Sequence, residues 1–281
     1  MLFRSKFAQV FPAAISPDEA ALTNRALQGG YNVGSSFKPF TAYSALQAGL
    51  LPGGPNFQYV DTGIYTIIAC QKDPSRFTGQ KCRFRNAWSP SLGRPTDYGR
   101  IGITEALAIS SDVFFYQIGD EFLELTGGQP VFQKELRQFG FGQKTGIDLP
   151  FETAGILPDK QVMAQLRKRK IINPDETFTS GQSILLAVGM GVLAVSPLQL
   201  TNAYSTIANS GSRMQPYVVE TIYAPGTPDS PVSGYADTTQ GKVVFTRNPK
   251  VLQRLDMRPE LRDPIISGLK AVVRMTSVNG H

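Results

Sequence analysis

The chain has 281 residues, of which 41% are hydrophobic and 18% are charged. This composition excludes a disordered or fibrous protein, and the length suffices for one large domain with ample core. The net charge of +6 is compatible with an anionic membrane or wall surface, but a solvated basic face also explains it, and no nucleic-acid motif is present.

The first predicted helix covers residues 35–49 and begins with the pair Ser35 and Lys38. The only histidine is His281, so a serine nucleophile here would have no imidazole partner. Residues three apart on a helix share a face, so the Lys38 amine can reach the Ser35 hydroxyl. A buried lysine with a lowered pKa can accept that proton. We therefore interpret Ser35 as a candidate nucleophile and Lys38 as its candidate base.

The residues around this pair favour a catalytic role over a chance occurrence of the pattern, although the spacing alone is weak evidence. Ser267 and Lys270 repeat the same pattern. Around the first copy, Gly34 permits a sharp turn and Pro39 falls in or just after the first helical turn, where a missing donor does least harm. The alternative is that Ser35 only caps the helix. The apolar positions that follow predict a helix buried along one face: Phe40, Ala42, Leu46 and Leu50.

Residues 50–102 are rich in Pro, Gly and Arg and predict a long loop region that contains Cys70 and Cys82. Their spacing is not a metal pattern, and with one terminal histidine a zinc site is not expected. A disulfide between the two cysteines and a pair of free buried thiols both remain open.

A second candidate constellation interrupts the helix predicted at 103–126. Ser110 and Asp112 lie within a strongly apolar segment, where polar groups are costly unless they find partners. If they face Lys38, Ser110 can relay a proton and Asp112 can orient the lysine. The alternative is a helix junction whose short polar side chains bond to local backbone. The same triplet pattern also occurs at 16–18 and 277–279, so the setting matters more than the spacing.

The remaining elements follow from periodicity and capping. We predict helices at 129–139 and 160–170, an apolar helix that begins at 183–188, and a closing helix at 259–275. Ser196 followed by Pro197 predicts the start of another helix, which ends near residue 211. Strands are predicted at 217–223 and 242–246, with loops at 140–160 and 226–240. The apolar stretch 184–200 is broken by Gly189, Gly191 and Pro197, so we do not interpret it as a membrane span.

These motifs in this order resemble the transpeptidase domain of class B penicillin-binding proteins, and most closely the elongation-type members. The family's first two active-site boxes match residues 35–38 and 110–112, with aspartate at 112 where many members have asparagine. Supporting stretches lie at 24–26, 111–116, 140–150, 181–184, 196–204 and 207–211. The resemblance implies an α+β penicillin-binding protein and serine β-lactamase-like transpeptidase fold, mostly its helical subdomain, with an incomplete antiparallel sheet.

The family's third box, Lys-Thr-Gly on a strand, is not expected at Lys144, Thr145 and Gly146. Those residues follow a glycine-rich turn too soon after the second box, so we interpret them as a structural loop. The true box is expected after the closing helix, beyond His281. Residues 1–281 are therefore expected to form a partial transpeptidase domain, with 1–23 a loose N-terminal remnant and further sheet strands after 281. We expect such a piece to be acylated by penicillin slowly or not at all.

The resemblance also implies a mechanism and a setting. Ser35 attacks a peptidoglycan stem peptide, Lys38 takes its proton, Ser110 protonates the leaving group and Asp112 orients Lys38. Stem peptides are the expected substrates, β-lactams the covalent inhibitors, and no cofactor, metal or nucleic acid is expected. The parent protein is expected to be anchored in the bacterial cell membrane, to act at its extracytoplasmic face and to have cell-wall synthesis partners.

Three alternatives stay open at this point. A serine β-lactamase or β-lactam sensor uses the same serine–lysine chemistry. A non-catalytic domain that binds a cell-wall partner is the second, and a mixed domain with an ordinary capped helix is the third.

Overall fold

The computed structural model describes residues 23–76, 82–224 and 242–275. Helices form the body, and every strand described belongs to a two-stranded antiparallel pair, as the α+β prediction requires. The patterns at 16–18 and 277–279 and the predicted loop at 226–240 lie outside the described residues. No described helix is long and apolar enough to cross a membrane.

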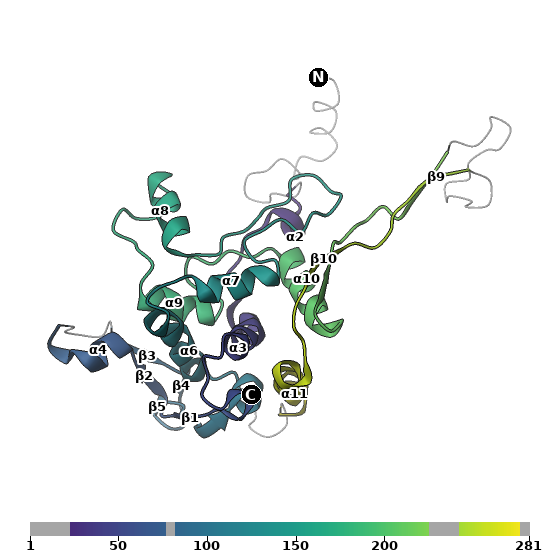
Figure 1. Cartoon of the computed structure of the whole chain (residues 1–281). Helices are drawn as coiled ribbons and strands as arrows, with labels where there is room; N and C mark the ends of the chain where they lie inside the picture. The colour runs from purple at the N-terminus through teal and green to yellow at the C-terminus, as the bar shows by residue number, and fades with distance from the viewer. Residues whose placement is uncertain (1–22, 77–81, 225–241, 276–281) are drawn as a thin grey trace.

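The helix α3 (Lys38–Gln47) runs through the middle of the body and continues from a single 3-10 turn, η2 (Gly34–Phe37). Helices α6 (Asp112–Leu125), α7 (Val131–Gln138) and α11 (Pro259–Met275) pack around it (Figure 1). Every residue from 38 to 46 is buried. The prediction of burial along one face was therefore wrong, because a helix surrounded by other helices has no solvent face.

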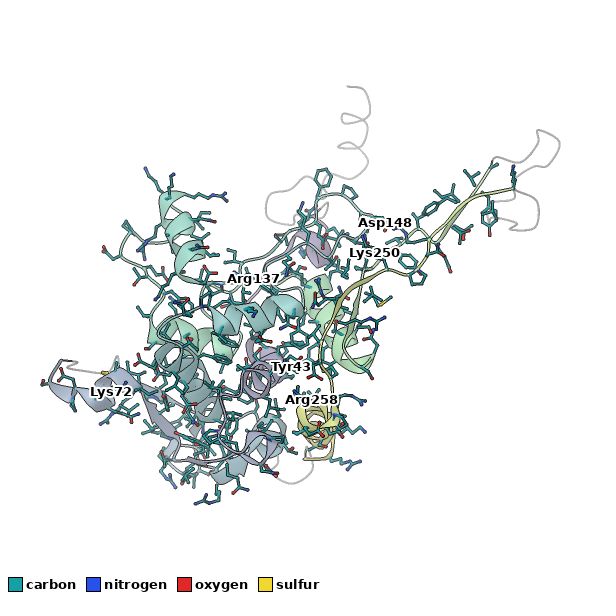
Figure 2. All side chains as sticks on the ribbon, in the orientation of Figure 1. Tyr43, Lys72, Arg137, Asp148, Lys250 and Arg258 are labelled. Atoms are coloured by element: carbon teal, nitrogen blue, oxygen red, sulfur yellow. A yellow bond between two sulfur atoms is a disulfide. The ribbon has the colours of Figure 1, made fainter. Side chains whose placement is uncertain are left out.

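Aromatic rings fill the space beside α3. The ring of Phe40 lies 5.0 Å from those of Phe139, Phe141 and Tyr204, each in an edge-to-face arrangement. Rings in this geometry attract one another beyond the area they bury. Figure 2 shows Tyr43 in the same interior, and its hydroxyl donates to the carbonyl of Asp256 at 3.0 Å. The rings and this bond hold α3 between its neighbours.

The region 50–102 was predicted as loop, and the structure corrects this. It contains the pairs β1 (Gln58–Asp61) with β6 (Gly99–Gly102), β2 (Ile64–Thr66) with β3 (Arg83–Arg85), and β4 (Trp88–Ser89) with β5 (Arg94–Pro95). Helix α4 (Ile68–Lys72) and two further 3-10 turns, η3 (Gly54–Asn56) and η4 (Pro74–Arg76), complete it. Strands of two to four residues are too short for an alternating pattern to emerge.

A disulfide joins Cys70 to Cys82, with their Cα atoms 6.0 Å apart. This settles the alternative that the sequence left open. The segment is also tied to α6, because Asp120 accepts hydrogen bonds from the Tyr65 hydroxyl at 2.8 Å and from the Ile68 backbone at 2.7 Å.

The helix predicted at 103–126 is two helices. α5 (Ile103–Ala108) ends before Ser110, and α6 begins at Asp112. α6 packs tightly on α9 (Ser180–Ala187), where the Ser183 hydroxyl donates to the Gly119 carbonyl at 2.5 Å. A side chain at Gly119 would collide with the α9 backbone at Ser183 and Ile184, so glycine allows α6 and α9 to approach closely.

Several later predictions are confirmed. The closing helix α11 covers 259–275, α7 matches 129–139 closely, and α8 (Lys160–Lys168) is the charged helix. α10 (Pro197–Ala208) begins at Pro197 under a capping box formed by Ser196 and Gln199. The short α2 (Arg25–Gln28) precedes the body.

A two-stranded arm projects from the body (Figure 1). β8 (Thr221–Tyr223) pairs with β9 (Val243–Thr246), so the strand predicted at 217–223 is shorter than expected. At its base β7 (Ser212–Met214) pairs with β10 (Val251–Arg254). Figure 2 shows Asp148 beside the base of the arm, where its carboxylate contacts Arg247 at 3.0 Å.

Candidate active site

The Lys38 amine is the centre of the candidate site. Only 2% of this side chain is exposed, and its Nζ donates to three oxygens of Ser110 and Asp112, where the chain passes from α5 into α6. The acceptors are the Ser110 carbonyl at 2.8 Å, the Ser110 hydroxyl at 3.1 Å and an Asp112 carboxylate oxygen at 2.7 Å. An ammonium group has three protons to donate, so all three are used. The structure thus brings Lys38, Ser110 and Asp112 together.

Two opposing effects act on the proton of Lys38. Burial lowers the pKa of its amine below the ordinary 10.5, because a charged group loses hydration there. The charge of Asp112 and its hydrogen bond to the amine raise that pKa, but burial is the larger effect. The Phe115 ring also faces the amine, with its centroid 5.5 Å from Nζ. The amine is therefore closer to losing a proton than a lysine in water.

Ser110 owes its position to the way α5 ends. Its backbone is left-handed, with φ 56°, and its N–H donates to the Leu107 carbonyl at 3.3 Å. The next N–H, that of Ser111, donates to the Ala106 carbonyl at 3.0 Å. This pair of bonds is the Schellman ending of a helix, in which glycine usually occupies the left-handed position. A serine there exposes its hydroxyl and presents both its oxygens to Lys38.

Ser35 lies in the 3-10 turn η2 and is exposed. Side chains three apart in such a turn are nearly eclipsed, so Ser35 and Lys38 share a face. Within the described part of the chain, the Ser35 hydroxyl makes no hydrogen bond, and the Lys38 amine is turned toward Ser110 and Asp112 instead. The candidate nucleophile Ser35 and its candidate base Lys38 are thus neighbours on one turn but are not directly bonded.

Three supports of this turn were not predicted from the sequence. Gly189 accepts a hydrogen bond from the Gly34 N–H at 3.0 Å, and a side chain at Gly189 would collide with the Gly34 carbonyl. The Tyr204 hydroxyl donates to the Ser36 carbonyl at 2.7 Å, and the Thr41 hydroxyl to the Ala187 carbonyl at 2.8 Å. The glycines at 189 and 191 were a visible signal, but nothing local shows which backbone they approach.

Lys144, Thr145 and Gly146 lie in a loop, as predicted, and not in a strand. The buried Glu152 accepts hydrogen bonds from the Thr145 N–H and hydroxyl, both at 2.6 Å, and from the Gly146 N–H at 3.0 Å. These contacts give the segment a structural role. Among the described residues, no group of histidine, cysteine and acidic side chains could hold a metal ion.

A family model described as the penicillin-binding protein transpeptidase domain matches residues 5–281. The chain is 31% identical over 255 residues to the peptidoglycan D,D-transpeptidase MrdA of Acinetobacter baumannii, which covers 90% of this chain and 32% of that protein. The MrdA protein of Escherichia coli K12 is 27% identical over 209 residues, which covers 74% of this chain and 28% of that protein. The chain therefore spans about a third of the length of these curated relatives.

Solved structures share the fold. The Pseudomonas aeruginosa PBP2 in complex with WCK 5153 matches with a TM-score of 0.67 and 24% identity, covering 95% of this chain and 50% of that one. The Helicobacter pylori PBP2 in complex with MreC matches with a TM-score of 0.62 and 21% identity, covering 98% and 40%. At these identities the likeness shows the fold alone, and that fold is the one predicted.

Proposed function

Because the chain belongs to the penicillin-binding protein transpeptidase family, we propose that it performs the serine acyl transfer by which peptidoglycan D,D-transpeptidases cross-link stem peptides. The single observation that carries the proposal is the buried Lys38 amine. It is held at 2.7–3.1 Å by Ser110 and Asp112 and lies one helical turn after the exposed Ser35. The described residues would then work as one transpeptidase unit around this site.

In the first step Ser35 Oγ attacks the carbonyl carbon of the penultimate D-alanine of a stem peptide. The Oγ–C bond forms, the C–N bond to the terminal D-alanine breaks, and the departing amine takes up a proton. Lys38 accepts the Ser35 proton, and the Ser110 hydroxyl passes a proton to the departing amine. An amine of a neighbouring stem then attacks the acyl-enzyme and regenerates Ser35. Positioned acid–base groups of this kind contribute about 10²–10⁴ in rate.

For this step Lys38 must first become a neutral amine. Burial favours that form, and Asp112 opposes it while keeping the amine in place. Once one proton is lost, the Ser110 hydroxyl, now 3.1 Å from Nζ as an acceptor, can rotate and donate to the amine. Ser110 is exposed and so is Ser35. Both hydroxyls are therefore open to a substrate, while the base that serves them is shielded from water.

The developing oxyanion needs donors, and we propose the Ser35 backbone N–H as one of them. It makes no hydrogen bond in the described part of the chain. Among the described residues, the Ser35 N–H is the one oxyanion donor that we assign. Loss of one donor costs about 10²–10³ in turnover. We therefore expect this chain to react with β-lactams slowly.

We also propose the cellular setting implied by the family. The chain would act on peptidoglycan at the extracytoplasmic face of the cell membrane, alongside other cell-wall synthesis proteins. A PBP2 from Helicobacter pylori, whose fold this chain shares, has been solved in complex with MreC. The disulfide between Cys70 and Cys82 is compatible with an oxidising compartment outside the cytoplasm.

The test is covalent labelling by a fluorescent penicillin, followed over hours by gel and by intact mass. We expect slow incorporation of one adduct per chain, which peptide mapping places on Ser35. Ser35→Ala should abolish it. Ser267→Ala, the matched change in the second Ser-x-x-Lys pattern, should leave it intact.

Labelling that survives Ser35→Ala would refute the proposed nucleophile, and a wild-type chain that stays unlabelled would refute the acyl transfer. The lifetime of the adduct separates a transpeptidase from a β-lactamase. We expect the adduct to persist over the assay, whereas rapid release of opened penicillin would favour the β-lactamase.

A further inference from the structure

The first turn of α6, which carries Asp112, is held from outside the helix. The first N–H groups of any helix lack partners within it. Here the N–H groups of Asp112 and Val113 donate to the Asn86 side-chain oxygen at 2.9 and 2.8 Å, and that of Phe114 donates to the Ser111 hydroxyl at 3.0 Å. Ser111 is an ordinary helix cap, but Asn86 directly follows strand β3 and lies 26 residues before Asp112 in the sequence. The start of α6 is thus anchored to another part of the fold.

The orientation of Asn86 is set by its other end. Its amide nitrogen donates to both carboxylate oxygens of Asp61 at 2.9 Å and to the Thr96 carbonyl at 2.9 Å. Since only acceptors surround that end, the amide oxygen must face the donors of α6. Asn86 therefore connects the Asp61 carboxylate on β1 and the Thr96 carbonyl to the N–H groups that begin α6.

Asp61 completes the connection through Ser111. One carboxylate oxygen accepts from the Ser111 hydroxyl at 2.5 Å, and the other accepts from the Gly63 N–H at 2.7 Å. Asp61, Asn86 and Ser111 are 1%, 3% and 0% exposed. A carboxylate so deeply buried is costly unless it is hydrogen-bonded, and bonds to a charged acceptor are about twice as strong as neutral ones. The three residues form one buried cluster.

This cluster acts on the site because Ser111 lies between the two residues that hold Lys38. Ser110 has a left-handed backbone, which costs a non-glycine residue about 1–2 kcal/mol, so its surroundings must maintain it. Asp112 has its N–H bonded to Asn86 and its carboxylate bonded to Lys38. A shift of Ser111 or of the first turn of α6 would move both contacts of the amine.

We propose that Asp61 and Asn86 are positioning residues of the active site, which hold Ser110 and Asp112 against the Lys38 amine through Ser111 and the first turn of α6. The inference rests on the proposed function of the same site. Neither residue touches the reacting atoms. Their effect is to keep the base and the proton relay in one geometry.

The chain offers a matched control for this role. Asp120 is also a fully buried aspartate, and it lies on α6 about two turns after Asp112. It accepts hydrogen bonds from Tyr65 and Ile68 rather than from the start of the helix. Asp61→Asn, on β1, and Asp120→Asn, on α6, therefore make the same chemical change at two buried aspartates, but only the first belongs to the cluster that anchors Asp112.

The primary readout is the titration of the Lys38 amine, followed by NMR on chain carrying ¹³C-labelled lysine and assigned with Lys38→Met. If Asp112 withdraws, the amine loses the charge that raises its pKa while burial persists, so its midpoint falls. We expect a fall of about one unit in Asp61→Asn, the low end of what an adjacent opposite charge contributes. Asp120→Asn should lower the melting temperature by a similar amount and leave the Lys38 midpoint unchanged.

The second readout is the pH profile of penicillin acylation, with a charge swap as rescue. Asn86→Asp alone places two carboxylates in contact, which must share a proton, so acylation should weaken progressively as pH rises and that proton is lost. The double variant Asp61→Asn with Asn86→Asp restores one donor and one acceptor between the two side chains, while the Thr96 carbonyl loses its donor and residue 61 loses one acceptor oxygen, so the rescue is expected to be partial. We expect the double variant to recover at least half of the acylation rate lost in Asn86→Asp at pH 8 and to recover a near-wild-type Lys38 midpoint.

The proposal is overturned if Asp61→Asn changes only the melting temperature, as Asp120→Asn does, or if a folded double variant recovers neither the acylation rate nor the Lys38 midpoint. The amine titration needs no acylation. An unlabelled wild-type chain with a shifted Lys38 midpoint in Asp61→Asn would therefore sink the transpeptidase proposal and support the positioning role. If the wild-type chain is labelled but the Lys38 midpoint does not move in Asp61→Asn, the transpeptidase proposal is supported and the positioning role is refuted.

Discussion

The chain contains the same four-residue pattern twice on helices, and the two copies differ in what they bury. At the start of α3, Lys38 is buried and Ser35 is exposed beside it. On α11, Ser267 and Lys270 are both exposed, and the buried member is Gly268. A side chain at Gly268 would come within 2.7 Å of Leu107 on α5. The first copy thus buries the lysine side chain in the core, whereas the second buries only a glycine, where α11 contacts α5.

The difference teaches that spacing determines which residues share a face, while packing determines what that face meets. α3 is enclosed by helices, so its lysine loses hydration and meets Ser110 and Asp112. α11 lies at the edge of the body (Figure 1), so its serine and lysine meet solvent. A buried, partnered amine can act as a base, whereas a solvated one stays protonated near neutral pH.

The largest expected effect separates the two lysines. Lys38→Met keeps the length of the buried chain but removes the base, so penicillin acylation should fall by about 10²–10⁴. Lys270→Met changes only a solvent-exposed charge and should leave the rate unchanged. The acylation rates of both variants can be measured by quenching the labelling reaction at set times. Equal rates in Lys38→Met and Lys270→Met would erase the functional distinction between the two copies.

The next prediction separates catalysis from stability at Ser110. Ser110→Gly removes the relay hydroxyl and also relieves the left-handed backbone. We expect acylation to fall by about 10² while the free energy of unfolding rises by about 1 kcal/mol, as urea denaturation can measure. Ser110→Ala is the control, since it loses the hydroxyl but keeps the strain. If Ser110→Gly is less stable than Ser110→Ala, the assigned helix ending is wrong.

A third prediction concerns the packing role of the second copy. Gly268→Ala places a methyl group against Leu107 and the Thr104 carbonyl, and overpacking of this kind costs about 1–3 kcal/mol. Ser267→Ala, one residue earlier and exposed, should change stability by about 0.5 kcal/mol or less. Thermal and urea unfolding of the two variants tests this. Similar stabilities would show that α11 tolerates displacement from α5.

The smallest effect is a pH dependence of stability specific to Lys38. Its folded pKa lies below the 10.5 of the unfolded chain, so between these values the unfolded state binds more protons and the free energy of unfolding rises with pH. The rise is about 1.4 kcal/mol for each unit between the two pKa values. The free energy of unfolding is measured against pH for the wild type and for Lys38→Met, and the second curve is subtracted from the first. The subtraction removes the contribution of the buried tyrosines, such as Tyr116 and Tyr204, whose pKa burial raises to about 12.

Local signals predicted some elements well. α11 was predicted with the bounds that the structure shows, because its apolar positions recur at helical spacing between clear ends. Pro197 after Ser196 predicted the start of α10, because a serine cap followed by proline at the first helical position is a local start signal. The spacing of Ser35 and Lys38 predicted that they lie one turn apart on one face, as they do, while their catalytic pairing stays a prediction. Each of these depends on residues within a few positions of one another.

Other features had no local signal. The break at Ser110 hides within one apolar run, since Ile109 and Val113 both suit a continuous helix. The strand pairs of residues 58–102 are only two to four residues long. Asp61 and Asn86 read as ordinary polar residues of a loop, and only their burial beside Ser111 distinguishes them.

The sequence alone determined which functional groups this protein has: a serine and a lysine one turn apart, and a second serine with an aspartate. It also determined several helices whose ends can be predicted from local signals. Only the tertiary structure decided that Lys38 is enclosed, that it meets Ser110 and Asp112, and that Asp61 and Asn86 hold them there. The reason is physical. Helical spacing and caps are local properties, whereas desolvation and hydrogen bonds between distant segments exist only once the chain has packed.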